Sequence, residues 1–301
     1  GARVVLLNYL LPRDVIKAIE REQVTGLTAV PPLYIQLAQA AWPAAAGAHL
    51  RYFASTGGRL PRATLAALRR QLPQARPFLM YGLTEAFRST YLPPAEIDRR
   101  PDSIGKAIPN AEILVLRDDG TPCVANEPGE LVHRGPLVAL GYWNDAEKTA
   151  ERFKPLPHQA PGRATGLVLP EVAVFSGDTV RMDEDGFLYF ISRRDEMIKT
   201  SGYRVSPTEI EEVLYATRLV GECIAFGVAD ERLGQAIHVI ATAPDGAELD
   251  PAALLAECRR RMPAYMVPAV IEAWRGALPR NPNGKNDRHQ LASTQGAKNA
   301  R

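Results

Sequence analysis

The beginning of the chain alternates between segments with apolar residues at helical spacing and short runs of continuous apolar residues. In the first of them, Val15, Ile16 and Ile19 fall on one face of a helix, which Gly26 is expected to end before the apolar run 27–30. The same pattern recurs and predicts helices over residues 33–41 and 61–72 and strands over residues 52–54 and 77–81. Strands that alternate with helices favour a mostly parallel sheet covered by helices.

From about Asp98 the pattern changes to short β-type runs separated by turn signals. Turns are expected at residues 118–120, 127–129 and 185–186, and a short helix at 145–152. These features predict an antiparallel or barrel-like subdomain. The segment 154–170 is rich in Pro and Gly and has no periodicity, which predicts an exposed loop.

A second boundary falls at residues 192–195, and a compact unit that mixes helices and strands follows it. Its expected first elements are a hairpin at 199–205 and a helix for which Ser206, Pro207 and Glu209 supply the N-cap, the first-turn proline and the acid of a capping box. Strands are then expected at 223–228, 237–243 and 269–274, a helix after Asp250-Pro251, and a frayed tail beyond His289. The predicted fold class is α/β: a parallel-sheet subdomain and a small β-barrel-like subdomain, followed by a compact α+β domain.

Composition limits the kinds of partner that this fold can have. The 301 residues are 46% hydrophobic and 23% charged, the profile of a soluble globular protein, and a chain of this length favours two cores. The 36 Lys and Arg residues nearly balance the 34 Asp and Glu residues, so the net charge of +2 does not indicate a nucleic-acid partner.

The cysteines and the apolar runs bear on where the protein works. Cys123, Cys223 and Cys258 are odd in number and lie far apart, so neither a disulfide framework nor a zinc site is indicated, and a reducing, cytoplasmic setting fits best. We expect no transmembrane segment and no signal peptide. Residues 1–3 lead directly into the apolar run 4–7, which suggests that the sequence begins inside a fold and is a fragment of a longer chain.

Two segments of the parallel-sheet region carry small or polar residues where the chain should turn. In Ser55-Thr56-Gly57-Gly58, small residues after a strand allow backbone amides to approach a ligand, although for this segment alone a simple strand-to-helix turn is the better interpretation. In Tyr81-Gly82-Leu83-Thr84-Glu85, at the carboxyl end of a strand, Tyr81 could stack on a base, Thr84 could donate to a phosphate oxygen and Glu85 could bind Mg²⁺. The alternative is that Thr84 caps a helix and Glu85 is its first-turn acid.

Two further segments lie later in the chain. Asp178 follows Phe175-Ser176-Gly177, and a run of charged residues leads from Arg193 to Arg204. A carboxylate with arginines nearby suits the hydroxyls of a ribose and the oxygens of phosphates. The simpler interpretation is that Asp178 lies in a turn and that the charged run is a solvated edge of a domain. Lys285 follows Asn281-Pro282-Asn283-Gly284 at an expected loop tip, where a lysine is often without a specific role but could also neutralise a phosphate. Residues 183–186 begin like a calcium loop but lack the distal Glu, so a hairpin turn is expected there.

Taken together and in order, these segments resemble the adenylate-forming superfamily of acyl-CoA synthetases, carrier-protein adenylation domains and luciferases. Residues 81–85 are similar to the YGxTE signature of that family. Other similar blocks are Gly129-Glu130-Leu131, Arg134-Gly135-Pro136, Gly141-Tyr142-Trp143, residues 175–178, residues 193–204 and residues 279–288. The sequence of residues 193–216 resembles that of acyl-CoA ligases associated with bacterial exosortase systems.

The resemblance implies a role for each matching residue. Thr84 would touch the α-phosphate of ATP and Glu85 would bind Mg²⁺; Asp195 would be the hinge and Lys285 the lysine of the adenylation step. Residues implied in binding the adenine, the ribose and coenzyme A are Gly57, Gly58, Tyr81, Gly82, Asp178, Arg193, Lys199, Gly202 and Arg204. Residues 1–192 would be the carboxyl-terminal part of the large AMP-binding domain, and residues 193–301 a mobile lid.

Three hypotheses about function remain open. The first is a ligase that joins a carboxylic acid to CoA with ATP and Mg²⁺; the second transfers the acid to the pantetheine arm of a carrier protein; the third is an inactive nucleotide-binding fragment. The family's phosphate loop with its lysine is not present in the sequence, and Ser192 and Asn286 depart from the family pattern. We therefore expect the chain to act as part of a longer enzyme.

Overall fold

The computed structural model describes residues 1–9, 11–43, 45–156, 171–194, 196–244, 247–281 and 286–299. The chain forms two compact units, and each is described separately. Unit 1 comprises Gly1–Pro77 and Glu196–Arg301, and unit 2 comprises Phe78–Asp195. The predicted domain boundary between residues 192 and 193 stays a prediction.

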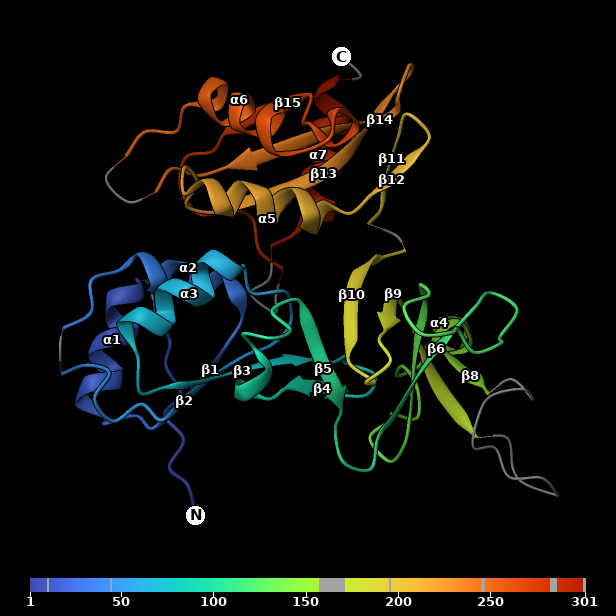
Figure 1. Cartoon of the computed structure of the whole chain (residues 1–301), viewed down its shortest axis with the longest axis horizontal. Coiled ribbons are helices and arrows are strands. Elements are labelled where there is room, and N and C mark those ends of the chain that lie inside the picture. Colours follow the sequence, from blue (N-terminus) through green and yellow to red (C-terminus); the bar gives the residue numbers. More distant parts are fainter. Residues whose placement is uncertain are drawn as a thin grey trace. The chain divides into compact units, whose positions relative to one another are not determined.

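The amino-terminal part of unit 1 alternates helices and strands as the sequence predicts (Figure 1). Its elements are α1 (Pro12–Arg21), β1 (Gly26–Ala29), α2 (Pro31–Gln39), β2 (Tyr52–Ser55) and α3 (Arg62–Gln71). Strands β1 and β2 pair in parallel, which confirms the predicted parallel pairing. The predicted end of the first helix at Gly26 is wrong, because the helix already ends at Arg21 and Gly26 begins β1.

Unit 2 is an antiparallel sheet, as the alternation of short strands and turn signals predicts. Its strand order is β3-β4-β5-β10-β9-β7-β6, with β8 paired to β9. The elements are β3 (Arg76–Tyr81, which begins in unit 1), β4 (Thr90–Leu92), the 3₁₀-helix η1 (Pro94–Glu96), β5 (Ser103–Ala107), β6 (Glu112–Leu116), β7 (Gly129–Arg134), α4 (Ala146–Arg152), β8 (Phe153–Pro155), β9 (Val172–Met182) and β10 (Leu188–Arg193). Apolar side chains of β6, β7, β9 and β10 form its core.

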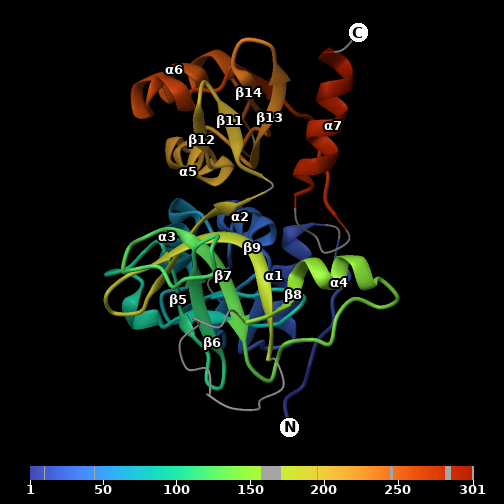
Figure 2. The ribbon, with the colours of Figure 1, turned by 90° about the vertical axis from the view of Figure 1, so that its right-hand side faces the viewer.

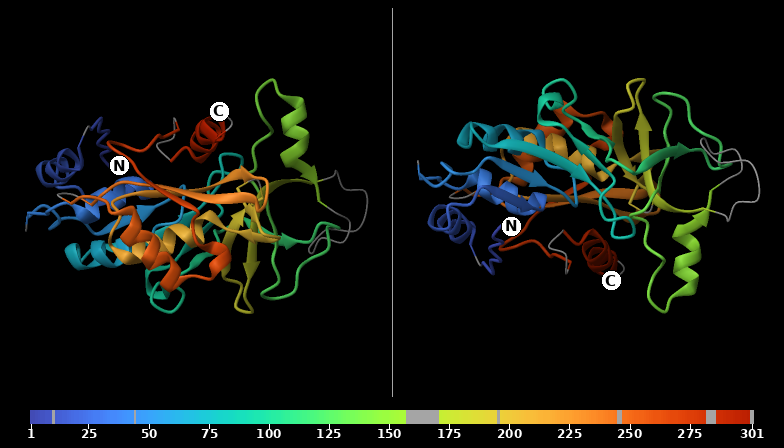
Figure 3. Two further views of the ribbon diagram at one scale, coloured as in Figure 1. Left: turned by 90° about the horizontal axis from the view of Figure 1, so that it is seen from above. Right: turned by 90° about the horizontal axis from the view of Figure 1, so that it is seen from below.

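Two local predictions for unit 2 are confirmed. Helix α4 begins after Asp145, whose side chain accepts a hydrogen bond from the backbone of Lys148, and the helix stands beside β8 (Figure 3). The calcium-like segment forms a hairpin turn, in which the Asp183 carboxylate accepts hydrogen bonds from the backbone of Asp185 and Phe187. Most of the predicted loop at 154–170 lies outside the described residues.

The carboxyl-terminal part of unit 1 is built on a second sheet of strand order β12-β11-β14-β13, with β15 paired to β14. Its elements are β11 (Ile198–Thr200), β12 (Tyr203–Val205), α5 (Pro207–Thr217), β13 (Cys223–Asp230), β14 (Gly234–Ala241), α6 (Pro251–Arg261), the 3₁₀-helix η2 (Ala264–Met266), β15 (Val270–Ala273) and α7 (Arg288–Asn299). Alternate residues of β13 face two cores: Ala225 packs with the apolar faces of α5 and α6, whereas Phe226 packs with Leu291 of α7. Figure 2 shows α7 on the opposite side of this sheet from α5 and α6.

Two predictions for this part need correction. Ser206 is the N-cap of α5 and Pro207 begins the helix, but no capping box forms, because the Ser206 hydroxyl pairs with the hydroxyl of Thr208. The predicted frayed tail beyond His289 is wrong, because the segment forms α7, which the buried Leu291 anchors. Asp250 caps α6 as predicted, since its carboxylate accepts hydrogen bonds from two backbone amides.

Over the described parts of the chain, no helix has both the length and the apolar character needed to cross a lipid bilayer.

Candidate functional site

The candidate site of unit 2 begins where β3 ends at Tyr81. A Cβ atom at Gly82 would lie 2.3 Å from the carbonyl oxygen of Phe87, so the backbone at position 82 has room only for glycine. The chain then reverses: Phe87 has a φ of 50°, and the Ser89 amide donates to the Tyr81 carbonyl over 3.0 Å. The alternative that Thr84 caps a helix is therefore wrong, because residues 84–86 form a turn that returns to β4.

Tyr81 and Asp178 meet although 97 positions separate them in the sequence. The Tyr81 hydroxyl donates to Oδ2 of Asp178 over 2.6 Å. Asp178 lies on β9 and is only 4% exposed, and its backbone amide donates to the hydroxyl of Ser176 over 3.0 Å. The carboxylate is thus held rigidly next to the end of β3.

Arg193 completes this cluster from β10. Asp178 and Arg193 are direct cross-strand partners, and Nε of Arg193 lies 3.4 Å from Oδ1 of Asp178. The register of β10 against β9 shifts between Phe190 and Ser192, a bulge of the kind that re-aims a side chain next to a functional site. The Arg193 side chain is 42% exposed, so its guanidinium can also reach a ligand.

Burial and the Asp178 carboxylate keep Tyr81 neutral. Burial raises the pKa of Tyr81 well above its usual value, and the neighbouring carboxylate of Asp178 raises it further. Tyr81 therefore remains a hydrogen-bond donor at any physiological pH. The two carboxylate oxygens of Asp178 are shared between the hydrogen bond from Tyr81 and the ion pair with Arg193.

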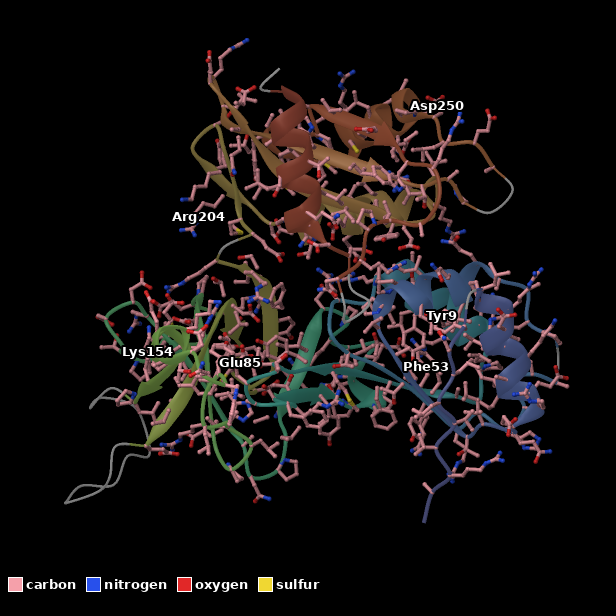
Figure 4. The ribbon with its side chains drawn as sticks, turned by 180° about the vertical axis from the view of Figure 1, so that it is seen from behind. Tyr9, Phe53, Glu85, Lys154, Arg204 and Asp250 are labelled. Carbon is pink, nitrogen blue, oxygen red and sulfur yellow. The ribbon has the colours of Figure 1, made fainter. Side chains whose placement is uncertain are left out.

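Glu85 lies in the turn after Gly82 (labelled in Figure 4), and a second tyrosine holds its carboxylate. The Tyr142 hydroxyl donates to Oε1 of Glu85, and the Ala139 amide donates to the Glu85 carbonyl over 2.8 Å. Tyr142 is itself fixed by its amide hydrogen bond to Thr149, of 2.9 Å, and by an edge contact with the ring of Phe153. Burial and the bond to Glu85 raise the pKa of Tyr142 to about 12.

Tyr142 is a site residue to which the sequence reasoning assigned no role. It belongs to the Gly141-Tyr142-Trp143 block that carries part of the family resemblance, and this block was the available signal. Its partner Glu85 is half-buried, while Thr84 is exposed. No cluster of three or more metal-binding side chains occurs in the part of the chain that the structure describes, so a cation held by Glu85 would need other oxygens from a ligand or from water.

The remaining predicted site residues lie in unit 1. Gly57, with a φ of 85°, and Gly58 follow β2 and precede α3, as predicted for a turn between a strand and a helix. Lys199 and Arg204 are exposed cross-strand partners in the β11–β12 hairpin, where Arg204 is labelled in Figure 4, and Gly202 occupies its tip with a φ of 81°.

The structure thus divides the predicted residues into two groups. Unit 2 brings together Tyr81, Gly82, Thr84, Glu85, Asp178 and Arg193. Gly57, Gly58, Lys199, Gly202 and Arg204 belong to unit 1. Asp195 and Lys285 lie outside the described residues.

We expect Gly82→Ala to destabilise unit 2 by about 1–3 kcal/mol, the usual cost of forcing an extra methyl group against fixed atoms. The Cβ would collide with the backbone of Phe87 and displace the turn that carries Thr84 and Glu85. Gly58→Ala is the matched control, because its Cβ would meet Pro31 at an ordinary 3.4 Å. Urea unfolding of both variants measures the difference, and equal midpoints would contradict the tight turn.

Comparisons with known proteins show the family of the chain. The family described as AMP-binding enzyme matches residues 1–143, and the family described as AMP-binding enzyme C-terminal domain matches residues 209–285. The chain is 34% identical over 298 residues to a long-chain-fatty-acid–CoA ligase of Yersinia pestis, covering 97% of this chain and 49% of the relative. The chain therefore spans about half the length of the curated relatives that it matches.

Solved structures give the same result for the fold. The anthranilate CoA ligase AuaEII in complex with anthranoyl-AMP is 25% identical, with a TM-score of 0.82 over 96% of this chain and 53% of that protein. ATP-bound MatB of Rhodopseudomonas palustris is 26% identical, with a TM-score of 0.79 over 97% of this chain and 54% of that protein. Both similarities cover the two units described above.

Proposed function

We propose, from the premise that this chain belongs to the family of AMP-binding enzymes, that it supplies the carboxyl-terminal part of an AMP-forming ligase. The whole enzyme would activate a carboxylic acid with ATP and transfer the acyl group to coenzyme A. The similarity to a CoA ligase over nearly the whole chain supports this activity.

The observation that carries the proposal is the cluster of Tyr81, Asp178 and Arg193. A buried carboxylate suits the two hydroxyls of a ribose, and a half-exposed guanidinium beside it suits a ribose or phosphate oxygen. The ring of Tyr81 would stack on the adenine, and the backbone at Gly82 would allow its close approach. The ATP and AMP complexes among similar structures support a nucleotide here.

Thr84 and Glu85 are proposed to act on the phosphates. Thr84 is exposed and can donate to an α-phosphate oxygen, and the Glu85 carboxylate keeps an oxygen that does not bond to Tyr142. One carboxylate together with phosphate oxygens and water is the ligand set that Mg²⁺ prefers at nucleotide sites, so Glu85 fits the ion that the family implies. When bound, Mg²⁺ would offset charge on the phosphates.

The proposed reaction has two steps. A carboxylate oxygen of the acid attacks the α-phosphorus of ATP, the bond to pyrophosphate breaks, and an acyl-adenylate forms, with Lys285 neutralising the charge that develops on the phosphate. A thiolate then attacks the acyl carbon, and AMP leaves with the electron pair of the broken C–O bond. Asp195 is proposed as the hinge between the two steps.

The second step would use the β11–β12 hairpin. Lys199 and Arg204 face each other across the two strands, an arrangement of like charges that an anionic ligand would stabilise. We assign them, with Gly202, to coenzyme A, whose phosphates are such a ligand. A pantetheine arm on a carrier protein is the alternative acceptor; consumption of CoA in the absence of any carrier would exclude that alternative.

The substrate named for the relative and the absence of a disulfide pattern in the sequence support a place for the enzyme in cytoplasmic fatty acid metabolism.

Exchange of pyrophosphate into ATP by the full-length protein that contains this chain tests the first step. The exchange should depend on an added carboxylic acid and on Mg²⁺.

We expect Asp178→Asn to weaken AMP binding about tenfold to a hundredfold, because the substitution replaces a charged hydrogen-bond acceptor by a neutral amide, which can also direct an N–H group toward Tyr81. Calorimetry with AMP measures this loss, and Asp119→Asn, an exposed turn residue, is the control. Unchanged binding by Asp178→Asn would refute the assignment of the ribose site.

A further inference from the structure

The turn that carries Thr84 and Glu85 ends in an arginine to which neither the motifs nor the nucleotide contacts assign a role. A Cβ atom at Gly82 would lie 3.0 Å from Cα of Arg88, so the backbone of Arg88 passes directly beside the end of β3. The hydrogen bond from Ser89 to Tyr81 closes the same turn. A ligand bound at the carboxyl end of β3 therefore lies next to Arg88.

The guanidinium of Arg88 is half-buried and has no carboxylate partner among the described residues. Its Nη1 lies 2.8 Å from the sulfur of Met80, which is a weak acceptor, and its guanidinium carbon lies 5.3 Å from the ring centre of Phe87. Burial lowers the pKa of Arg88, the direction expected for a cation that is removed from water and has no anion beside it.

Three arginines of unit 2 differ from Arg88 in that each has a carboxylate partner. Arg100 pairs with Asp183, Arg117 with Glu127 and Arg134 with Glu112. A partly buried cation without such a partner is costly, and a bound anion removes that cost. The isolation of Arg88 thus indicates an anion that comes from outside the described chain.

The geometry of β3 separates this anion from the nucleotide. Successive residues of a strand point to opposite faces, so the side chains of Met80 and Tyr81 diverge. Tyr81 reaches Asp178, the proposed ribose ligand, whereas Arg88 contacts Met80. A ligand at the end of β3 would therefore present its nucleotide part on the Tyr81 face and its acyl part on the face of Met80 and Arg88.

We propose that Arg88 is a specificity-determining residue that binds a second carboxylate on the acid, so that the substrate class is dicarboxylic. The inference rests on the proposed function and adds the substrate class. The forked donors of arginine match a carboxylate with two parallel hydrogen bonds, and the ring of Phe87 beside the guanidinium limits its movement.

The test is pyrophosphate exchange by the full-length protein with a series of α,ω-dicarboxylic acids, each paired with its monomethyl ester. The best diacid should exceed its ester in kcat/KM by about tenfold to a hundredfold, the value of a charge-assisted hydrogen bond. Arg88→Met should abolish this preference by slowing the diacid and not the ester. Arg88→Lys should keep part of it, because it keeps the charge but loses the fork.

The outcomes separate the inference from the proposed function. Exchange with no acid of either kind overturns both. Exchange with esters as good as with diacids, or an equal loss of both in Arg88→Met, overturns the inference alone. A rise in the KM for ATP with unchanged diacid preference would assign Arg88 to the nucleotide and would also overturn the inference. If Arg88→Met does not fold, as judged by its thermal midpoint, Arg88→Lys and the diacid-to-ester ratio of the natural enzyme decide the question.

Discussion

Arg288→Met should destabilise the carboxyl-terminal part of unit 1 by about 3–5 kcal/mol, the cost of removing one partner from a buried ion pair. Arg288 donates to the Ala225 carbonyl over 2.8 Å, to Glu211 over 2.7 Å and to Glu196. Burial raises the pKa of the Glu211 carboxyl even with the guanidinium beside it. Without Arg288, the largely buried carboxylate of Glu211 and the partly buried carboxylate of Glu196 would lose their cation.

The pH dependence of the variant provides an independent check. A carboxyl group whose pKa is higher in the folded than in the unfolded protein binds more protons when folded, so its contribution to stability is lost as the pH rises. The destabilisation by Arg288→Met should therefore shrink as the pH falls toward the usual pKa of a glutamate, 4.5. Adding Glu211→Gln to Arg288→Met should recover part of the loss at neutral pH.

Hydrogen exchange of the β13 and β14 amides measures the local stability, and urea unfolding measures the midpoint. Arg260→Met is the matched control, because Arg260 pairs with Glu257 on the exposed surface of α6 and its removal should hardly change the midpoint. If Arg288→Met and Arg260→Met unfold at the same urea concentration, the buried cluster does not stabilise the fold.

Most elements could be predicted because their signals are local. The spacing of Val15, Ile16 and Ile19 predicted a helix with one buried face, and all three side chains are buried in α1. The hairpin turn at residues 183–186 was predicted from Asp and Gly at positions that a turn requires. Propensity and periodicity were sufficient wherever the element needed no distant partner.

The errors arose where a distant partner decides the structure. The tail after His289 has few apolar residues, and it forms a helix because Leu291 packs with Phe226, which lies 65 positions earlier. The pattern at Thr84 and Glu85 suits a helix start, yet the positive φ of Phe87 and the bond from Ser89 to Tyr81 reverse the chain. Contacts of this kind leave no local signal.

The same limit applies to the candidate site. The residues of the site could be named from motifs, but the contact between Tyr81 and Asp178 joins two strands far apart in the sequence. The contact of Tyr142 depends on its neighbour Glu85. The role that we propose for Arg88 depends on the absence of a carboxylate beside it among the described residues. Asn286 departs from the family pattern, and its side chain accepts a hydrogen bond of 3.1 Å from Arg280.

Lys285→Ala should slow acid-dependent pyrophosphate exchange by about 10²–10³-fold, the usual effect of removing one group that stabilises developing charge. Residues on both sides fix the ends of the segment that carries this lysine. Arg280 and Asn286 form an antiparallel bridge, and the Asp287 amide donates to the Pro279 carbonyl over 2.9 Å. Arg280 also pairs with the buried carboxylate of Glu222. The described residues on either side of positions 282–285 are thus held in place.

The two half-reactions should respond differently to Lys285→Ala. Transfer of the acyl group from a synthetic acyl-adenylate to CoA should proceed at nearly the natural rate, because the charge on the departing pyrophosphate arises only in the first step. Lys17→Ala, on the exposed face of α1, is the control for loss of a lysine. Lys285→Arg should restore little, since the planar guanidinium cannot occupy the place of a compact ammonium. Normal exchange by Lys285→Ala would remove Lys285 from the mechanism, whereas equal loss in both half-reactions would indicate damage to the fold and not to the chemistry.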